Sequence, residues 1–356
     1  MRALSPRRYL AALALAAASV VALAWAYVAL FPALYLDPEY GAWRAKERLL
    51  ADCRLGQAVV VGNSRAAAGI LPALLSVPAT NLAVGGGEAI EALAAVRRAL
   101  ACPTPPRLVL IALGPGQFVQ PDLFWERTVR YGFLNGAELA ELASASRATG
   151  DFSVYDNGHG DGLPAALRAW LYRARFPGLS FASLTRGGLF LRAWANARTY
   201  RATLAARGQY FFGTAPGCDQ VAVEGHLDAF RPLPVLDLYF DRLLALLAAR
   251  GVAAAFVSMP LNDATEAAVK PEIGHAFAAY LHAYQQRYPG LRLIGAPLYG
   301  WPDALFGDAF AHLNPTGAAL FSRRLARCLG PSGGACDLDW PGAAVQSAAP
   351  SAQEGA

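Results

Sequence analysis

Residues 58–64 read AVVVGNS, and this stretch decides the fold class. It begins with four apolar residues, three of them β-branched, which is typical of a short strand buried on both faces of a sheet. The strand is predicted to end at Gly62, because Gly62, Asn63 and Ser64 are residues that favour turns. A sheet buried on both faces needs helices on both sides, so helices are expected to alternate with strands along the chain.

The alternation of strand, loop and helix continues over much of the chain. The predicted strands are 58–61, 80–84, 108–113, 252–258 and 291–294. The predicted helices are 88–100, 236–250, 275–288 and 316–329. This pattern predicts an α/β fold, a three-layer parallel sheet flanked by helices of the flavodoxin-like kind. Ligands bind such folds at the carboxyl ends of the strands. Three glycine-marked loops, at 62–64, 85–87 and 114–116, are expected to meet there.

An apolar segment near the N-terminus is expected to cross a membrane. Residues 9–31 contain no charged side chain, and 23 residues are enough for a helix to cross a hydrocarbon core of about 30 Å. Arginines precede the segment and acidic residues follow it, so the N-terminus is predicted to lie inside and the domain to be periplasmic or otherwise extracytoplasmic. The alternative is a cleaved signal peptide, with Ala24, Trp25 and Ala26 as the small-x-small site. Either alternative exports the domain from the cytoplasm.

The 356 residues are enough for one large domain or two small ones. We predict one principal domain in which the alternation is interrupted by a long aromatic-rich insertion. The predicted divisions are a cytoplasmic basic tip at 1–8, a transmembrane anchor at 9–32, a short helical stalk at 33–56, an α/β domain at 57–330 with an insertion at about 118–234, and a disordered tail at 331–356.

The five cysteines all follow the anchor, and an oxidising compartment permits them to form disulfides. Cys328 and Cys336 flank a glycine-rich loop that a disulfide would close. Cys53 and Cys102 each precede a predicted strand and form a second candidate pair. An odd number leaves at least one thiol free or intermolecular, and buried free cysteines are the alternative for each. Because the chain has no CxxC or CxxH spacing, no metal site is predicted.

Ser64 is the candidate nucleophile, because it directly follows the predicted strand 58–61. A hydroxyl at that position lies at the edge of the sheet, close to backbone N–H groups that can stabilise an oxyanion. The alternative is a serine that only caps a helix or forms a turn.

His312 is the candidate base, because it lies just before a predicted helix. Asn314 and Pro315 are suited to the cap and first turn of that helix, and they would hold His312 in a fixed position. A catalytic histidine also needs an acidic partner to orient its ring, and Asp308 is the candidate. The alternative is an ordinary helix cap with an unrelated histidine beside it.

Together these motifs resemble the SGNH hydrolase superfamily, also called GDSL-like. Its first block resembles residues 62–64, its second resembles residues 81–86, and its last carries an Asp and a His that resemble Asp308 and His312. The resemblance implies an SGNH-type serine esterase or acyltransferase, with backbone groups of Ser64 and Gly86 in the oxyanion hole. Two departures stand out. Gly116 occupies the position of the family's oxyanion asparagine, and Asp308 precedes His312 by four residues instead of three.

Further expectations follow from the resemblance and not from the composition. An anchor, an exported SGNH-like domain and a missing asparagine are similar to the proteins that O-acylate exopolysaccharides or cell-wall polymers, such as the alginate acetylation proteins and the D-alanylation protein of teichoic acid synthesis. This implies a polysaccharide substrate, a membrane-bound O-acyltransferase as partner, and no cofactor. Arg65, Gln117 and Asn314 are the substrate-binding candidates, with Gln117 also the candidate substitute for the asparagine. The rival hypothesis is a non-catalytic SGNH-like scaffold in a polysaccharide modification or export complex.

The insertion carries a charge pattern of its own. Residues 163–218 contain eight arginines, no acidic residue and many interleaved aromatic residues. Nucleic acid is not expected as a partner outside the membrane. A basic and aromatic surface suits lipid headgroups, with the inner membrane as the partner, or an anionic glycan. The alternative is a packed helical subdomain with solvated arginines.

Overall fold

A parallel five-stranded sheet forms the centre of the protein. The computed structural model describes residues 5–121, 123–156, 164–174, 188–308, 312–330 and 338. The strands are, in chain order, β1 (Ala58–Gly62), β2 (Ala79–Asn81), β3 (Leu108–Ala112), β4 (Ala253–Val257) and β6 (Leu291–Ile294), and they pair in the order β2-β1-β3-β4-β6. This is the order of a flavodoxin-like doubly wound sheet, in which the topological switch point lies between β1 and β3.

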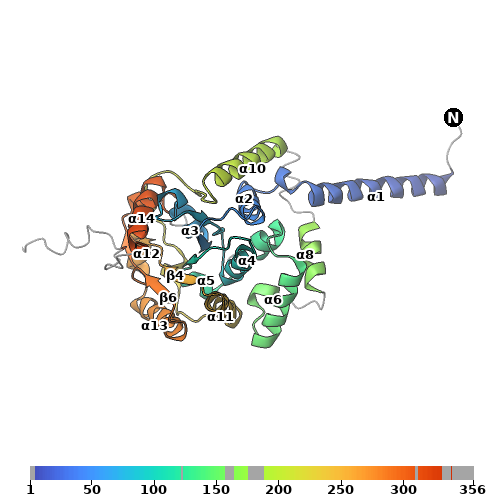
Figure 1. The fold of residues 1–356 in the computed structure, drawn as a ribbon. Helices are drawn as coiled ribbons and strands as arrows, with labels where there is room; N and C mark the ends of the chain where they lie inside the picture. The colour runs from blue at the N-terminus through green and yellow to red at the C-terminus, as the bar shows by residue number, and fades with distance from the viewer. Residues whose placement is uncertain are drawn as a thin grey trace, which may run out of the picture.

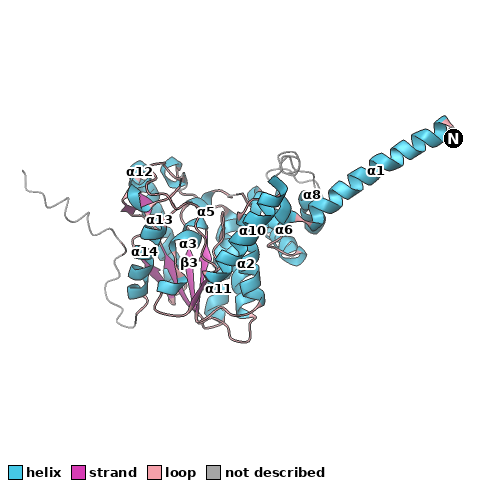
Figure 2. Ribbon diagram, turned by 90° about the horizontal axis from the view of Figure 1, so that it is seen from above, coloured by secondary structure: helices cyan, strands magenta, loops and turns pink. Residues whose placement is uncertain are grey.

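Alternate residues of β1, β3 and β4 enter two separate hydrophobic cores. Val59 and Val61 of β1 face the larger core, whereas Val60 faces the other. The larger core is covered by α2 (Glu39–Ala51), α4 (Ala89–Leu100), α11 (Pro234–Ala249) and α13 (Pro271–Arg287), and the smaller one by α3 (Ser64–Gly69) and α14 (Pro315–Cys328). The sheet therefore lies between two layers of helices (Figures 1 and 2), and the prediction of an α/β fold with a helix-flanked parallel sheet is confirmed.

The predicted strands all form, but two local features differ from the sequence expectation. Strand β2 is only three residues long, because Leu82 to Val84 already belong to the following loop. A second, two-stranded sheet, β5 (Leu261–Asn262) with β7 (Gly300–Trp301), extends beyond the end of β4. Short connecting elements are η1 (Pro32–Leu34), η2 (Pro72–Leu74), α5 (Gly116–Val119), α12 (Asp263–Ala268) and η5 (Asp303–Leu305).

The N-terminal helix α1 (Pro6–Leu30) projects from the domain, as both views show (Figures 1 and 2). Residues 6–27 of it are long and apolar enough to cross a membrane, and none of the window is buried in the protein. The segment 33–56, expected as a stalk, does form a helix, α2, but this helix packs into the domain. Trp43 is buried against Tyr131 and Phe133, and Lys46 is buried as well. The domain therefore begins directly after α1.

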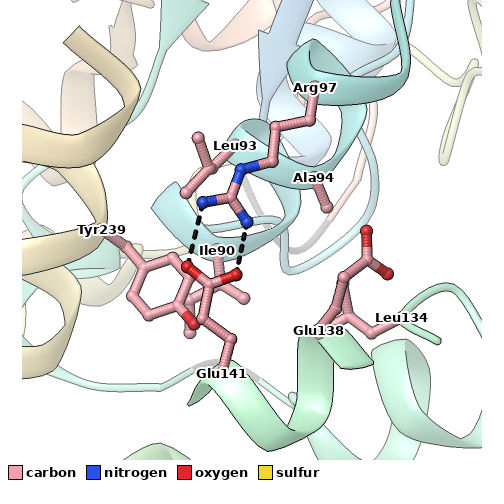
Figure 3. A pocket seen from close by; sticks show the side chains of 8 residues that line it. All are labelled: Ile90, Leu93, Ala94, Arg97, Leu134, Glu138, Glu141 and Tyr239. Carbon is pink, nitrogen blue, oxygen red and sulfur yellow. Dashed lines mark hydrogen bonds and ion pairs between the residues drawn. The ribbon is translucent and has the colours of Figure 1, made fainter. Parts of the chain in front are cut away.

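The described part of the insertion is mainly helical. Its elements are the π-helix η3 (Trp125–Val129), α6 (Gly136–Thr149), α7 (Ser153–Asp156), α8 (Ala165–Ala174), α10 (Gly188–Ala205) and η4 (Val223–His226). Helix α6 is fixed to the sheet layer by a bidentate ion pair between Arg97 of α4 and Glu141, at 2.5 and 2.9 Å, which Arg242 of α11 joins. The ion pair spans a hollow of about 10 Å³ (Figure 3), which has room for about one water molecule.

The disulfide predicted between Cys53 and Cys102 is present and joins the region after α2 to the end of α4. Cys328 is also disulfide-bonded, and Cys336, its expected partner, lies outside the described residues. Cys218 is free and buried. Of the predicted tail, only Leu338 is described. It is fully buried, and its carbonyl accepts a hydrogen bond of 2.9 Å from Trp301 Nε1. Leu338 thus packs into the smaller core, and the prediction of a disordered tail over 331–356 stays a prediction.

Candidate active site

A cavity of about 540 Å³ lies where the segments after β1 and β3 meet the end of the insertion. This is the switch point of the sheet, where doubly wound folds bind their ligands. Most of the residues singled out in the sequence line it, including Ser64, Asp308 and His312. Its full lining is Asn63, Ser64, Arg65, Gly116, Gln117, Gln120, Leu123, Arg127, Phe212, Gln220, Val221, Ala222, Val223, Asp308 and His312.

Ser64 is the first residue of α3, and its neighbours explain why a helix begins there. Gly62 is needed because β1 and β3 approach closely, so that a Cβ at this position would lie 2.0 Å from the carbonyl oxygen of Ala112. The side chain of Asn63 caps α3 by accepting from the backbone N–H groups of Arg65 and Ala66, at 3.1 and 3.4 Å. The capping function that was the alternative role for Ser64 is thus performed by Asn63, and Ser64 is partly exposed and lines the cavity.

His312 and Asp308 form a close pair in spite of their four-residue spacing. The two carboxylate oxygens of Asp308 contact different atoms of His312: Oδ2 lies 2.6 Å from Nδ1, and Oδ1 accepts from the backbone N–H at 3.1 Å. Because an ionised carboxylate only accepts hydrogen bonds, Nδ1 carries the proton and Nε2 keeps its lone pair. This is the tautomer that a general base requires.

The imidazole of His312 is covered by an aromatic ring that the sequence motifs did not indicate. The ring of Phe212 stacks on it, with the centroids 4.5 Å apart and the planes 24° apart. Only 3% of His312 is exposed. Burial lowers the pKa of His312, although hydrogen bonding and charge from Asp308 oppose this effect. His312 therefore stays neutral, and able to accept a proton, at pH values at which an ordinary histidine is already protonated.

The side-chain amide of Gln117 has its orientation fixed by unambiguous donors. Because Asn63 Oδ1 accepts from two backbone N–H groups, Asn63 Nδ2 is the donor of that side chain, and it lies 2.7 Å from Gln117 Oε1. The backbone N–H of Gly114 donates to the same oxygen at 3.0 Å. Gln117 lines the cavity, and Nε2 is therefore the donor end of its amide.

The position expected to hold an oxyanion asparagine has no room for one. A Cβ at Gly116 would lie 2.6 Å from Val223 Cγ1, so the insertion occupies the space that a side chain would need. Gly116 itself lines the cavity, whereas Gly86 does not. Gly86 lies in a left-handed turn with φ +67° after β2. The predicted oxyanion groups at Ser64 and Gly116 are thus brought together at the cavity, and Gly86 is not.

Arg65 and Glu224 form a buried ion pair beside Ser64. Two guanidinium nitrogens of Arg65 donate to the two carboxylate oxygens of Glu224, at 3.1 and 2.6 Å. The exposed fractions of the side chains are 9% and 0%. This pair connects α3 to η4 of the insertion and thereby fixes the segment 220–223 over the cavity. A substrate-binding role for Arg65 stays a prediction, because its charge is already balanced by the protein.

A second cation at the cavity, Arg127, connects the cavity to α2, the helix that follows α1. Arg127 Nε lies 3.2 Å from Glu39 Oε2, and Glu39 also accepts from Trp43 Nε1 at 3.1 Å. Burial raises the pKa of Glu39, and Arg127 opposes this effect. Behind Glu39, the ammonium of Lys46 contacts the carbonyl oxygen of Ala83, in the loop after β2. Helix α2 therefore supports two of the loops at the carboxyl edge of the sheet.

Asn314 lies behind the cavity and caps α14. Its Oδ1 accepts from the backbone N–H of Gly317 at 3.0 Å, and its Nδ2 donates to the carbonyls of Ala304 and Phe306. These contacts confirm the predicted cap, which holds the segment bearing His312, and its substrate-binding role stays a prediction. Among the described residues, no cluster of His, Cys, Asp or Glu has the arrangement of a metal site.

Comparisons with protein-family models, with curated proteins and with solved structures give no significant match to this chain.

Proposed function

We propose that this chain is an SGNH-type serine esterase or O-acyltransferase that acts outside the cytoplasmic membrane on an ester of a polysaccharide. The observation that supports this most directly is the convergence of Ser64 with the Asp308–His312 pair on one cavity at the switch point of the sheet. These residues lie almost 250 positions apart in the chain, so their meeting follows from the fold and not from local sequence.

The proposed reaction proceeds through an acyl-enzyme. Ser64 Oγ attacks the carbonyl carbon of the acyl donor while His312 Nε2 takes the hydroxyl proton. The oxyanion is stabilised by N–H donors of the loops after β1 and β3 and by Gln117 Nε2, which takes the role of the missing asparagine. The leaving alcohol takes the proton from His312. A sugar hydroxyl or water then attacks the carbonyl carbon of the acyl-enzyme while His312 accepts its proton. The bond between that carbon and Ser64 Oγ breaks, His312 returns the proton to Oγ, and the new ester or the free acid leaves.

The rival candidate is a non-catalytic scaffold with the same fold, and the glycine at position 116 favours it. The orientation of Gln117 favours the enzyme, because two hydrogen bonds to its Oε1 fix the amide of a residue that lines the cavity, and a scaffold has no evident use for an amide fixed in this way. A membrane-bound acyltransferase partner, which the resemblance implies, would supply the acyl group in a transfer reaction.

A serine-reactive fluorophosphonate separates the two candidates. We expect the full-length protein in detergent to be labelled at Ser64, as located by peptide mass spectrometry, and to hydrolyse a small neutral ester. Ser64→Ala should abolish both signals, whereas Ser153→Ala, which removes a hydroxyl away from the cavity, should change neither. Lack of labelling at Ser64 in folded protein, together with lack of hydrolysis, would support the scaffold.

A further inference from the structure

Two helices of the insertion carry outward-facing apolar side chains next to the membrane helix. On α8, Leu167, Trp170 and Leu171 are exposed, with 54% of Trp170 accessible. On α10, Leu191 is 70% exposed and Trp194 is 61% exposed. Exposed apolar side chains that gather on one side of a soluble domain indicate an interaction surface and are seldom left in water.

The spacing of these residues shows that the exposed apolar side chains of each helix lie on one side of it. At about 100° per residue, Leu167 and Leu171 lie roughly opposite the fully buried Ala169. Leu191 and Trp194 likewise lie roughly opposite Asn196, which is only 3% exposed. Each helix therefore has exposed apolar residues on a side that the described protein does not cover.

Asn196 also fixes α10 to the base of α1. Its Nδ2 donates to the carbonyls of Ala33 and Leu36, at 3.0 and 2.9 Å, and its Oδ1 accepts from the backbone N–H of Gly41 at 2.9 Å. A single residue of α10 thus makes two hydrogen bonds to the connection between α1 and α2 and one to the first turn of α2. Helix α8 contacts α1 itself. Figures 1 and 2 both show α8 and α10 on the side of the domain from which α1 departs.

We propose that this apolar face of α8 and α10 lies in the headgroup region of the membrane that α1 spans, so that the domain rests on the bilayer instead of hanging from one helix. The occupant is lipid, because α8 contacts the apolar helix α1 and α10 is bonded to the segment that follows it, and α1 is itself exposed along its length. Tryptophan is the residue that membrane interfaces favour. Arginines border the face, and Cζ of Arg198 lies 4.7 Å from the ring centroid of Trp194. No acidic residue of 163–218 repels anionic headgroups.

Lipid-attached quenchers test the proposal on the full chain. The protein, with Cys218→Ala as background, is placed in nanodiscs of phosphatidylcholine and phosphatidylglycerol, and a polarity-sensitive fluorophore is attached in turn to Leu171→Cys and Leu191→Cys. The matched control is His275→Cys, an exposed position of α13 on the opposite side of the domain. We expect blue-shifted emission and loss of most fluorescence to headgroup-level quenchers at positions 171 and 191, and almost no loss at 275.

A label at Leu13→Cys, within α1, reports separately on the membrane span and should be quenched by lipids labelled deep in the acyl chain. Quenching at 13 with labels at 171 and 191 as exposed to water as the one at 275 would overturn the proposal, and would leave a protein partner as the occupant of this face. Absence of quenching at 13 would overturn both the span and the proposal. Neither result depends on whether Ser64 reacts.

Discussion

The stacked ring of Phe212 should control the pH at which His312 works. Because burial lowers the pKa of His312, the acid limb of kcat/KM for a small neutral ester should lie below pH 6.5. Phe212→Ala lets water reach the imidazole and should move the limb upward toward 6.5. Phe212→Leu keeps an apolar cover and should move it less. A limb that stays in place or moves down in Phe212→Ala would show that this ring does not shield the base.

Asp308 should contribute to ester hydrolysis through its charge and through the tautomer that it imposes on His312, and less through the size of its side chain. Asp308→Asn keeps the size of the side chain, but it removes the carboxylate that accepts from Nδ1 and from the backbone N–H of His312. We expect kcat for ester hydrolysis to fall on the order of 10³- to 10⁴-fold, which is less than in Ser64→Ala. Unchanged activity in Asp308→Asn would mean that another group orients His312.

At the residue scale, the sequence predicted the residues that follow a strand or precede a helix. Ser64, Asp308 and His312 are recognisable because motif and chain position agree. Phe212 and Arg127, which line the cavity, and Glu224, which pairs with Arg65 beside it, were not predicted as site residues, because they come from an insertion that has no repeating pattern. The density of aromatic residues near position 210 was the only available signal for Phe212.

The ion pair between Arg65 and Glu224 should be the strongest link between α3 and η4. Glu224→Gln leaves a guanidinium buried without a counter-charge, so we expect a loss of about 3–5 kcal/mol in the free energy of unfolding. Arg65→Met and Glu224→Leu made together remove both charges. The double variant should lose much less unfolding free energy than the sum of the losses in Arg65→Met alone and Glu224→Leu alone. Denaturant unfolding in detergent measures these values. Losses that simply add would show that the pair is not coupled.

Lys46 of α2 should give the protein a stability that rises with pH. Burial lowers its pKa to about 7, whereas an unfolded lysine titrates near 10.4. Between these values the unfolded state binds more protons, so stability rises with pH over that window and is lost as pH falls toward 7. Lys46→Met should remove this rise, measured as the change in Tm between pH 7 and 9. Lys270→Met, which removes an exposed ion pair with Asp228, should retain the rise of Tm with pH. An equal rise of Tm with pH in the two variants would contradict the assignment of this rise to Lys46.

At the element scale, strands were easier to predict than the functions of helices. Short apolar β-branched runs such as 58–61 have few alternatives, and each of them forms a strand. Helix α3 has only six residues and no periodicity, so only its capping residue could have indicated it. Helix α2 was predicted as a helix, but its burial depends on contacts with Asn196 and Tyr131, which lie far away in the sequence. Local pattern therefore specifies the element, and the distant partner decides whether it is core or stalk.

The whole molecule should have its N-terminus in the cytoplasm and its domain outside. The arginines at the N-terminal end of α1 and the disulfide after α1 both indicate this orientation. A fusion that reports on topology should follow Ala356 and not Gly330, because truncation at 330 would remove Leu338 from beneath Trp301. We expect alkaline phosphatase at the C-terminus to be active and a fluorescent protein that folds only in the cytoplasm to be dark.

Moving the basic residues by Arg7→Glu and Arg8→Glu, with two lysines placed after α1, should lower phosphatase activity. A bright cytoplasmic reporter in the unmodified chain would refute the orientation, and with it the proposed extracytoplasmic substrate.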